Sequence, residues 1–247
     1  MAVTIGELDE LDRSLLRQIL IKKISTPAES LFLELGCLDV ETVIKSRRIN
    51  YLHYLITRKN SEMLSQFFRT QWKYPCNSKE WTEQVRINLD DFDIPLDLNF
   101  IKSKSEYSFK NMVKVKAKEY CFMKMMEKKI GHSKMDGVFY TSLKIQNYLK
   151  SNKFTPTQAR LIYSFRTRMA DFQENVQGSQ GHTPCPLCLV HFDSQVLAFQ
   201  CPKVKSEIKL RGKYDDIFTE VIPLEIVETL TEVMKYRDAF KQQRAVE

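Results

Sequence analysis

Hydrophobic residues recur every three or four positions along most of the chain, which is the spacing of amphipathic helices. The longest such pattern runs over residues 106–129, with an apolar stripe on one face. Lys110, Lys114 and Lys118 rise at four-residue steps on another face of the same predicted helix. Alternating strand patterns are rare, and only residues 196–199 favour a strand. The pattern therefore predicts an all-α protein.

Capping signals mark where several of these helices begin. Residues 26–29 read Thr-Pro-Ala-Glu and residues 155–158 read Thr-Pro-Thr-Gln. Each combines a capping hydroxyl, a proline at the first helical position and an acid or amide at the third. We expect the second of these helices to run to about Ala170. Asn77 and Glu80 can serve in the same way for a helix that bears an apolar face over residues 81–92.

The predicted elements divide the chain into four segments. A helical bundle is expected over residues 1–75, followed by a basic helical linker over 76–172. A small irregular module is expected over 173–212, and a C-terminal helical segment over 213–247, in which Pro223 opens the last helix. The bundle is expected to pack through five apolar side chains: Leu31, Leu35, Ile49, Leu52 and Leu55.

Composition places the chain among globular proteins. Its 247 residues are 43% hydrophobic and 28% charged, proportions that are wrong for a disordered protein. No apolar run approaches 18 residues, and the N-terminus turns acidic at Glu7 without a basic segment before an apolar one. We therefore expect an intracellular protein, nuclear or cytoplasmic, with no membrane partner.

Positive charge is concentrated in the middle of the chain. The net charge is +7, yet residues 101–170 alone hold sixteen Lys or Arg against four Asp or Glu. The stretch before this block, residues 80–100, holds six acids and one Arg. Such a basic block suits contact with phosphate, and it equally suits a set of solvated, lysine-rich helix faces.

Three of the six cysteines form the strongest chemical signal. Cys185 and Cys188 have the Cys-x2-Cys spacing that places two thiolates at adjacent corners of a zinc tetrahedron, and Cys201 can supply a third ligand. His191 is the favoured fourth ligand, and His182 is the alternative. Buried, reduced cysteines without metal are the competing interpretation.

No catalytic constellation is found. The Tyr-x-Asp-Asp box of reverse transcriptases has one residue between the tyrosine and the paired acids, and Tyr214-Asp215-Asp216 lacks that residue. The acidic residues at 90–93 are typical of a helix end. Glycine-rich phosphate loops and a Pro-Asp nuclease pair are absent from the sequence, and no His/Asn pattern accompanies the cysteines. We therefore expect no enzymatic activity from this chain by itself and no small-molecule substrate.

The order of several motifs resembles a known family. Residues 25–36 combine a Thr-Pro helix start with Leu-Glu-Leu-Gly, and residues 44–55 contain Arg-Arg-Ile-Asn-Tyr-Leu. Trp81 and Val85 follow, then Phe-Arg-Thr-Arg-Met over residues 165–169, and then the three cysteines with Asp-Ser-Gln over 193–195. In this order, over residues 10–205, they resemble the region downstream of the polymerase core in non-LTR retrotransposon reverse transcriptases.

The resemblance implies a helical thumb, a linker and a Cys/His zinc knuckle. Such a segment is non-catalytic and contacts RNA or DNA, as template-primer or target, beside a reverse-transcriptase palm domain. The palm is not found before Met1 and no endonuclease follows, so the chain resembles a detached part of the polyprotein. The residues expected to contact phosphate are Arg47, Arg48, Lys110, Lys114, Lys118, Arg166 and Arg168.

One position departs from the family pattern. The family places a histidine four residues before the last cysteine, and Leu197 stands there in this chain. Either His191 replaces that ligand or the knuckle has lost its zinc. The alternative function is a helical protein-interaction scaffold derived from a retroelement, with structural zinc or buried thiols and no role in binding nucleic acid.

Overall fold

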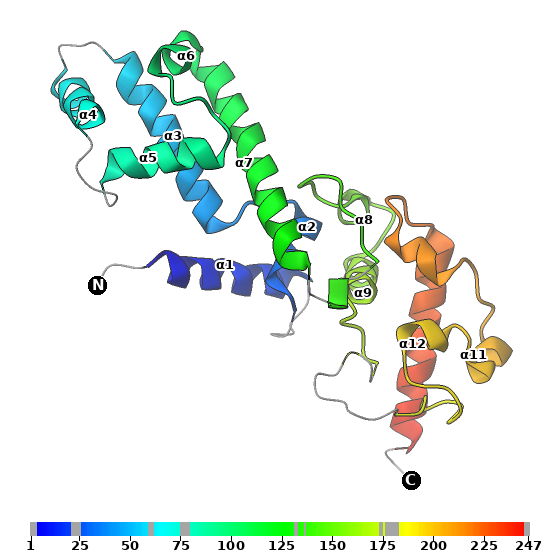
Figure 1. The fold of residues 1–247 in the computed structure, drawn as a ribbon. Coiled ribbons are helices and arrows are strands. Elements are labelled where there is room, and N and C mark those ends of the chain that lie inside the picture. The colour runs from blue at the N-terminus through cyan, green and yellow to red at the C-terminus, as the bar shows by residue number, and fades with distance from the viewer. Residues whose placement is uncertain are drawn as a thin grey trace. The chain divides into compact units, whose positions relative to one another are not determined.

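The computed structural model describes residues 4–20, 26–58, 62–74, 80–130, 133–135, 137–172, 175 and 183–244. This part of the chain is mostly helical and contains no β-strand, as the sequence predicts (Figure 1). In chain order the helices are α1 (Ile5–Leu20), α2 (Ala28–Leu35), α3 (Val40–Thr57), α4 (Met63–Lys73), α5 (Trp81–Asp91), α6 (Leu98–Ser103), α7 (Glu106–Lys129), η1 (Ser133–Met135), α8 (Asn147–Lys150), α9 (Pro156–Arg166), α10 (Gln195–Ala198), α11 (Pro202–Glu207), η3 (Tyr214–Phe218) and α12 (Leu224–Arg244).

The chain forms two compact units. Unit 1 comprises residues 1–14 and 37–127, and unit 2 comprises residues 15–36 and 128–247. The expected boundary at 75/76 falls inside unit 1, where α5 packs against both α3 and α4. The expected boundaries at 172/173 and 212/213 fall inside unit 2, so the units do not coincide with the four segments of the sequence.

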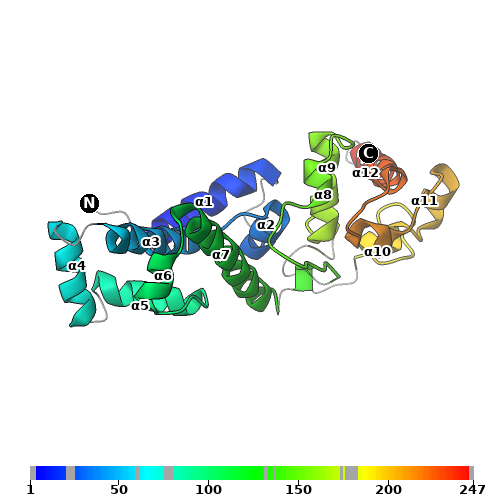
Figure 2. The same ribbon diagram turned by 90° about the horizontal axis from the view of Figure 1, so that it is seen from above.

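Unit 1 is built around α3. Helices α4, α5 and α6 pack against it (Figures 1 and 2). Helix α7 contributes its apolar stripe to the same core. Helix α7 has the bounds that the sequence predicts. The core residues are Ile49, Leu52, Leu55, Ile56, Phe68, Val85, Leu89, Phe92, Ile94, Ile101, Phe109, Val113 and Ala117. Leu31 is buried in unit 2 instead, so the five expected bundle residues do not share one core.

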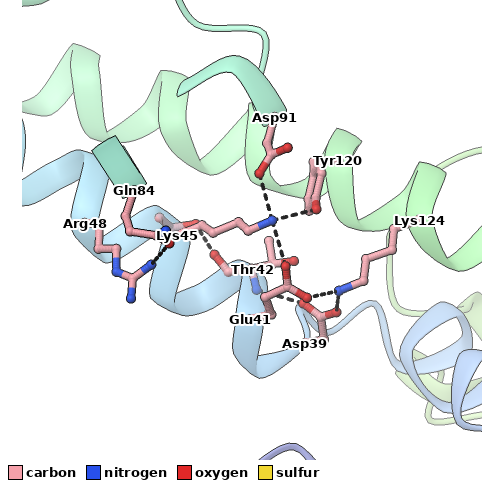
Figure 3. Close-up of polar contacts among 10 residues, drawn as sticks. Asp39, Glu41, Thr42, Lys45, Arg48, Gln84, Asp91, Tyr120 and Lys124 are labelled. Carbon is pink, nitrogen blue, oxygen red and sulfur yellow. Dashed lines mark hydrogen bonds and ion pairs between the residues drawn. The ribbon is translucent and has the colours of Figure 1, made fainter. Parts of the chain in front are cut away.

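A polar network joins three helices of unit 1 at the end of this core (Figure 3). The Lys45 Nζ on α3 donates to Asp91 at the end of α5 at 2.8 Å and to the Tyr120 hydroxyl on α7 at 2.7 Å. The same ammonium group is 2.7 Å from the carboxylate of Glu41, one turn earlier on α3. Burial alone would lower the pKa of Lys45, but these partners raise it above its usual value. Lys45 therefore stays charged and fastens the three helices together.

Lys124 extends this network along α7. Its Nζ lies 2.6 Å from a carboxylate oxygen of Asp39, which caps α3, and 2.6 Å from Glu41 (Figure 3). Burial would raise the pKa of Glu41, but hydrogen bonds from Lys124 and Lys45 lower it from 4.5 to about 2. Two of the chain's lysines are thus structural groups rather than parts of a solvated face.

The capping signals have different outcomes. Thr155 forms the predicted capping box with Gln158 and opens α9. That helix ends at Arg166 rather than near Ala170, because Arg168 adopts a left-handed conformation with φ of 49°. Glu80 is the N-cap residue of α5 without a side-chain cap bond, and Asn77 lies outside the described residues.

The other helix start differs from the prediction. Helix α2 has Pro27 at its N-cap position without a side-chain cap bond, so the helix begins one residue later than the motif predicts. The buried Ser30 hydroxyl in its first turn donates to the Pro27 carbonyl at 2.7 Å and lies 2.7 Å from the Tyr163 hydroxyl. The predicted strand at 196–199 is also wrong, because Ser194 accepts the Leu197 N–H and begins α10.

Gly36 explains why the Leu-Gly motif ends α2. It is the C-cap residue, with φ of 63°, in the left-handed region that glycine favours. A Cβ at this position would lie 2.3 Å from the backbone nitrogen of Ile145. The close approach lets the Gln146 N–H donate to the Glu34 carbonyl at 3.0 Å. The motif therefore has a packing role within unit 2.

Unit 2 is organised by α9, η3 and α12, which contact one another. The predicted last helix is confirmed, with Ile226, Val227, Leu230 and Val233 buried. None of the described helices has the length and apolar character needed to span a bilayer.

Candidate functional site

A tight turn in unit 2 presents the first two cysteines. The Cys185 N–H donates to the His191 carbonyl at 2.6 Å, and the Leu189 N–H donates to the Cys185 carbonyl at 2.9 Å. Leu189 has a φ of 58°, and an isolated antiparallel bridge joins Pro184 to Phe192. The chain thereby reverses direction within residues 185–191, so both cysteine sulfurs can face the same side.

The third cysteine comes from the start of a helix. Cys201 is the N-cap residue of α11, which follows the turn in the chain. The sulfurs of Cys185, Cys188 and Cys201 all lie within 4.8 Å of one another, and those of Cys185 and Cys201 are 3.9 Å apart. Tetrahedral zinc with bonds of about 2.3 Å separates its sulfur ligands by about 3.8 Å. The three cysteines can therefore hold a metal ion.

The surroundings of the sulfurs act on their pKa values in opposite directions. Burial would raise the pKa of Cys188, but backbone hydrogen bonds from His191 and Val190 lower it. Burial raises the pKa of Cys201 to about 11. Backbone N–H groups such as those beside Cys188 are the kind of partner that orients thiolate ligands around a metal.

The fourth ligand differs from the expectation. Within the described chain the metal-ligand group consists of the three sulfurs, and the ring nitrogens of His191 are not part of it. His191 instead uses its backbone, as acceptor from Cys185 and donor to Cys188. The alternative ligand, His182, lies outside the described residues. Leu197, at the family's histidine position, is half-buried on α10.

A buried ion pair that sequence reasoning missed holds this module onto α12. Arg237 and Asp193 are both almost fully buried, with 2.8 Å between the guanidinium and the carboxylate. The Arg237 guanidinium also lies 4.2 Å from the centre of the Phe172 ring. Leu230, Val233 and position 237 are spaced three and four residues apart, so they share the apolar face of the helix. An arginine on that face could have predicted a buried acidic partner.

The expected phosphate-contacting lysines share one surface of unit 1. We call Lys110, Lys114 and Lys118 the lysine stripe; all three are exposed and one helical turn apart on α7. Lys110 forms an exposed ion pair with Glu106, whereas Lys114 and Lys118 have no ion pair with any described residue. Tyr107, which is 79% exposed, extends the same face by one turn.

The expected arginines are in less uniform surroundings. Arg47 is exposed on α3, and Arg48 is half-buried and donates to the Gln84 amide oxygen at 3.5 Å (Figure 3). Arg168 is half-buried in unit 2. Among these three, Arg47 presents its side chain most openly to a partner.

Arg166 requires a correction. Its side chain is 2% exposed, and its Nε donates to the buried carboxylate of Glu34 at 2.9 Å. A second nitrogen donates to the Ile217 carbonyl at 2.7 Å. The Tyr140 and Tyr148 hydroxyls also donate to Glu34, at 2.7 and 2.9 Å. The expectation that Arg166 contacts phosphate is therefore wrong, because its guanidinium is a structural group of the core.

No family model, curated protein or solved structure matches this chain.

Proposed function

We propose that this chain is a non-catalytic, nucleic-acid-binding segment of a retroelement reverse transcriptase that contacts phosphate through the lysine stripe of α7. The observation that carries the proposal is the common exposure of Lys110, Lys114 and Lys118 on one face of a long, regular helix. The family assignment rests on the order of sequence motifs, and the charge and geometry of unit 1 support the binding function.

The dimensions of the stripe suit a polyanion. Lysines four residues apart rise about 6 Å along a helix, so the three ammonium groups span about 12 Å. Duplex DNA carries one negative charge per roughly 1.7 Å of its axis, so several phosphates lie along that span. Glu106 is the acid paired with the stripe, and its ion pair with Lys110 is exposed and weak enough for a phosphate to replace.

Other lysines of the basic block are unsuited to this role. Lys124 is held by Asp39 and Glu41, and Lys116 lies 2.9 Å from Asp93 and 3.4 Å from Glu119. Acidic partners on unit 1 neutralise these two side chains. Lys114 and Lys118 of the stripe differ from these two side chains in having no ion pair with any described residue.

We further propose that Cys185, Cys188 and Cys201 hold a structural zinc ion. Thiolate ligands favour zinc among the common divalent metals, and bound zinc would fasten the start of α11 to the turn at residues 185–191. A water molecule, or a side chain outside the described residues, completes the tetrahedron. The chemistry that zinc supplies here is structural, because the site contributes to folding.

Charge reversal at the stripe tests the binding function. The variant Lys110→Glu, Lys114→Glu, Lys118→Glu is compared with the matched variant Lys203→Glu, Lys205→Glu, Lys209→Glu, which changes the same charge at three exposed lysines of unit 2. Affinity for a fluorescent DNA duplex is measured by anisotropy at several salt concentrations. The stripe variant should flatten the slope of log affinity against log salt by roughly three units. An equal effect of both variants would contradict the stripe, and no binding by the wild-type chain would favour the scaffold alternative.

A further inference from the structure

A groove in unit 1 lies beside the first residue of the lysine stripe. It runs between α3 and the start of α7 and has a volume of about 620 Å³. That volume is within the range of about 300–1,000 Å³ for sites that enclose small ligands. The lining residues that matter here are Tyr51, His53, Tyr54, Lys104, Phe109 and Lys110.

Two tyrosines form one wall of the groove. Tyr51 and Tyr54 are 45% and 42% exposed, and their rings stack with 5.7 Å between centroids and 17° between planes. The Arg58 guanidinium lies 4.2 Å from the Tyr54 ring centre, so this ring already accepts a planar group in a stacked position. Arg58 also donates hydrogen bonds to the Tyr54 hydroxyl and to Glu62, so a base that stacks on this face of Tyr54 has to displace an exposed side chain from these contacts. The wall is therefore a stacking platform.

The floor of the groove is fixed. His53 is buried, its ring stacks on Phe109 with 4.6 Å between centroids, and its Nε2 is hydrogen-bonded to the Lys104 carbonyl at 3.0 Å. These contacts join α3 to the segment that leads into α7. The groove is consequently pre-formed, and a ligand would not have to order it.

The charges around the groove favour an anionic ligand. Lys104 and Lys110 line it, and Glu106 is the acid among its lining residues. The exposed carboxylate of Glu106 is paired with Lys110. Because Lys110 is also the first residue of the lysine stripe, a chain of phosphates that leaves the groove can continue along Lys114 and Lys118.

We propose that this groove binds an unpaired base of single-stranded nucleic acid, stacked against Tyr51 and Tyr54, while the lysine stripe contacts the adjoining phosphates. Stacking requires an accessible base face, which a single strand offers and an intact duplex does not. The proposal rests on the proposed nucleic-acid-binding function and adds the class of ligand. It assigns affinity for bases to α3 and affinity for phosphate to α7.

The test separates bases from phosphates. Binding of the full chain to oligodeoxythymidylate is compared with binding to an oligomer of the same length built from abasic sites, and with binding to a duplex. Stacking of one base is worth about 5- to 150-fold in affinity. The wild-type chain should therefore bind the thymidylate oligomer at least about fivefold more tightly than the abasic oligomer.

Single substitutions locate this preference. Tyr54→Ala should remove the preference for thymidylate while leaving affinity for the abasic oligomer and the duplex unchanged, and Tyr54→Phe should retain it. Phe67→Ala is the matched control, because Phe67 is an exposed aromatic of unit 1 outside the groove. Unchanged affinity for the duplex shows that a variant is folded. If Tyr54→Ala loses affinity for the duplex, Tyr51→Ala is used in its place for the comparison of thymidylate with the abasic oligomer.

The outcomes distinguish this inference from the proposed function. Two outcomes would overturn the groove proposal alone. In the first, the preference for thymidylate survives in both alanine variants. In the second, the wild-type chain binds the duplex but does not prefer thymidylate over the abasic oligomer. A wild-type chain that binds none of the three ligands overturns the groove and the proposed function together. If the stripe variant loses affinity for the duplex while the tyrosine variants keep the wild-type preference for thymidylate, the result supports phosphate contact by the stripe and refutes base binding in the groove.

Discussion

The Arg166 Nε donates to the Glu34 carboxylate at 2.9 Å, and both side chains are buried in unit 2. The carboxylate also accepts hydrogen bonds from two tyrosine hydroxyls, and the guanidinium donates to a backbone carbonyl. Every charge in this group has a partner, which is the condition under which an ion pair is tolerated in a core. The pair joins α2 to α9, which are more than a hundred residues apart in the sequence.

Removing one partner of this pair should destabilise the protein strongly. Arg166→Met leaves Glu34 as an uncompensated buried charge and should lower the free energy of unfolding by about 3–5 kcal/mol. The double variant Glu34→Leu, Arg166→Met should lose less than the sum of the two single variants, because each single change leaves an unpaired group. Urea unfolding followed by circular dichroism measures both effects. Strict additivity would show that the two side chains do not interact.

The network at α3 predicts a loss of stability in acid. Glu41 has its pKa lowered from 4.5 to about 2 in the folded chain, so it binds a proton more readily when unfolded. Its contribution to stability is complete above the unfolded pKa and is lost as the pH falls from about 5 towards 2. Glu41 is partly exposed, and solvent reduces the size of this effect.

A substitution isolates the contribution of Glu41. Glu41→Gln should reduce stability at pH 7 and make its decline between pH 5 and 2 shallower than in the wild-type chain. Glu10→Gln provides a comparison at an exposed carboxylate of unit 1 that has no ion pair with any described residue. Unfolding curves collected across this pH range measure the difference, and parallel curves for the wild-type and Glu41→Gln chains would refute the ion pairs of Glu41.

The cysteine group predicts metal binding. Purified under reducing conditions, the chain should contain close to one zinc ion, and a chelator should lower the melting temperature of unit 2. Cys188→Ser should abolish zinc binding, whereas Cys37→Ser, at a cysteine outside the group, should leave it unchanged. Elemental analysis measures the content. A metal-free chain that is unaffected by chelator would identify the three cysteines as buried thiols.

Local features of the fold could be predicted from the sequence because they depend on near neighbours. Helix α7 has its predicted bounds, since its apolar spacing is uninterrupted over 24 residues. The capping box at Thr155 also depends only on the next three residues. The strand prediction at 196–199 failed because Ser194, just outside the apolar run, caps a helix.

Features that depend on distant residues could not be predicted in the same way. Arg166 was expected at the surface because its buried partner, Glu34, is 132 positions away. The two units could not be found either, because residues 15–36 pack with the C-terminal part of the chain. In the candidate metal centre the cysteine spacing was sufficient to bring three sulfurs together, but the direction of the His191 ring depends on a backbone turn that spacing does not specify.

Binding of the wild-type chain to a DNA duplex over a range of salt concentrations tests the central claim most directly. If the three lysines of the stripe contact phosphate, the logarithm of the affinity should fall linearly with the logarithm of the salt concentration, with a slope of roughly −3 or steeper. Absence of binding at low salt, or an affinity that does not change with salt, would contradict the account.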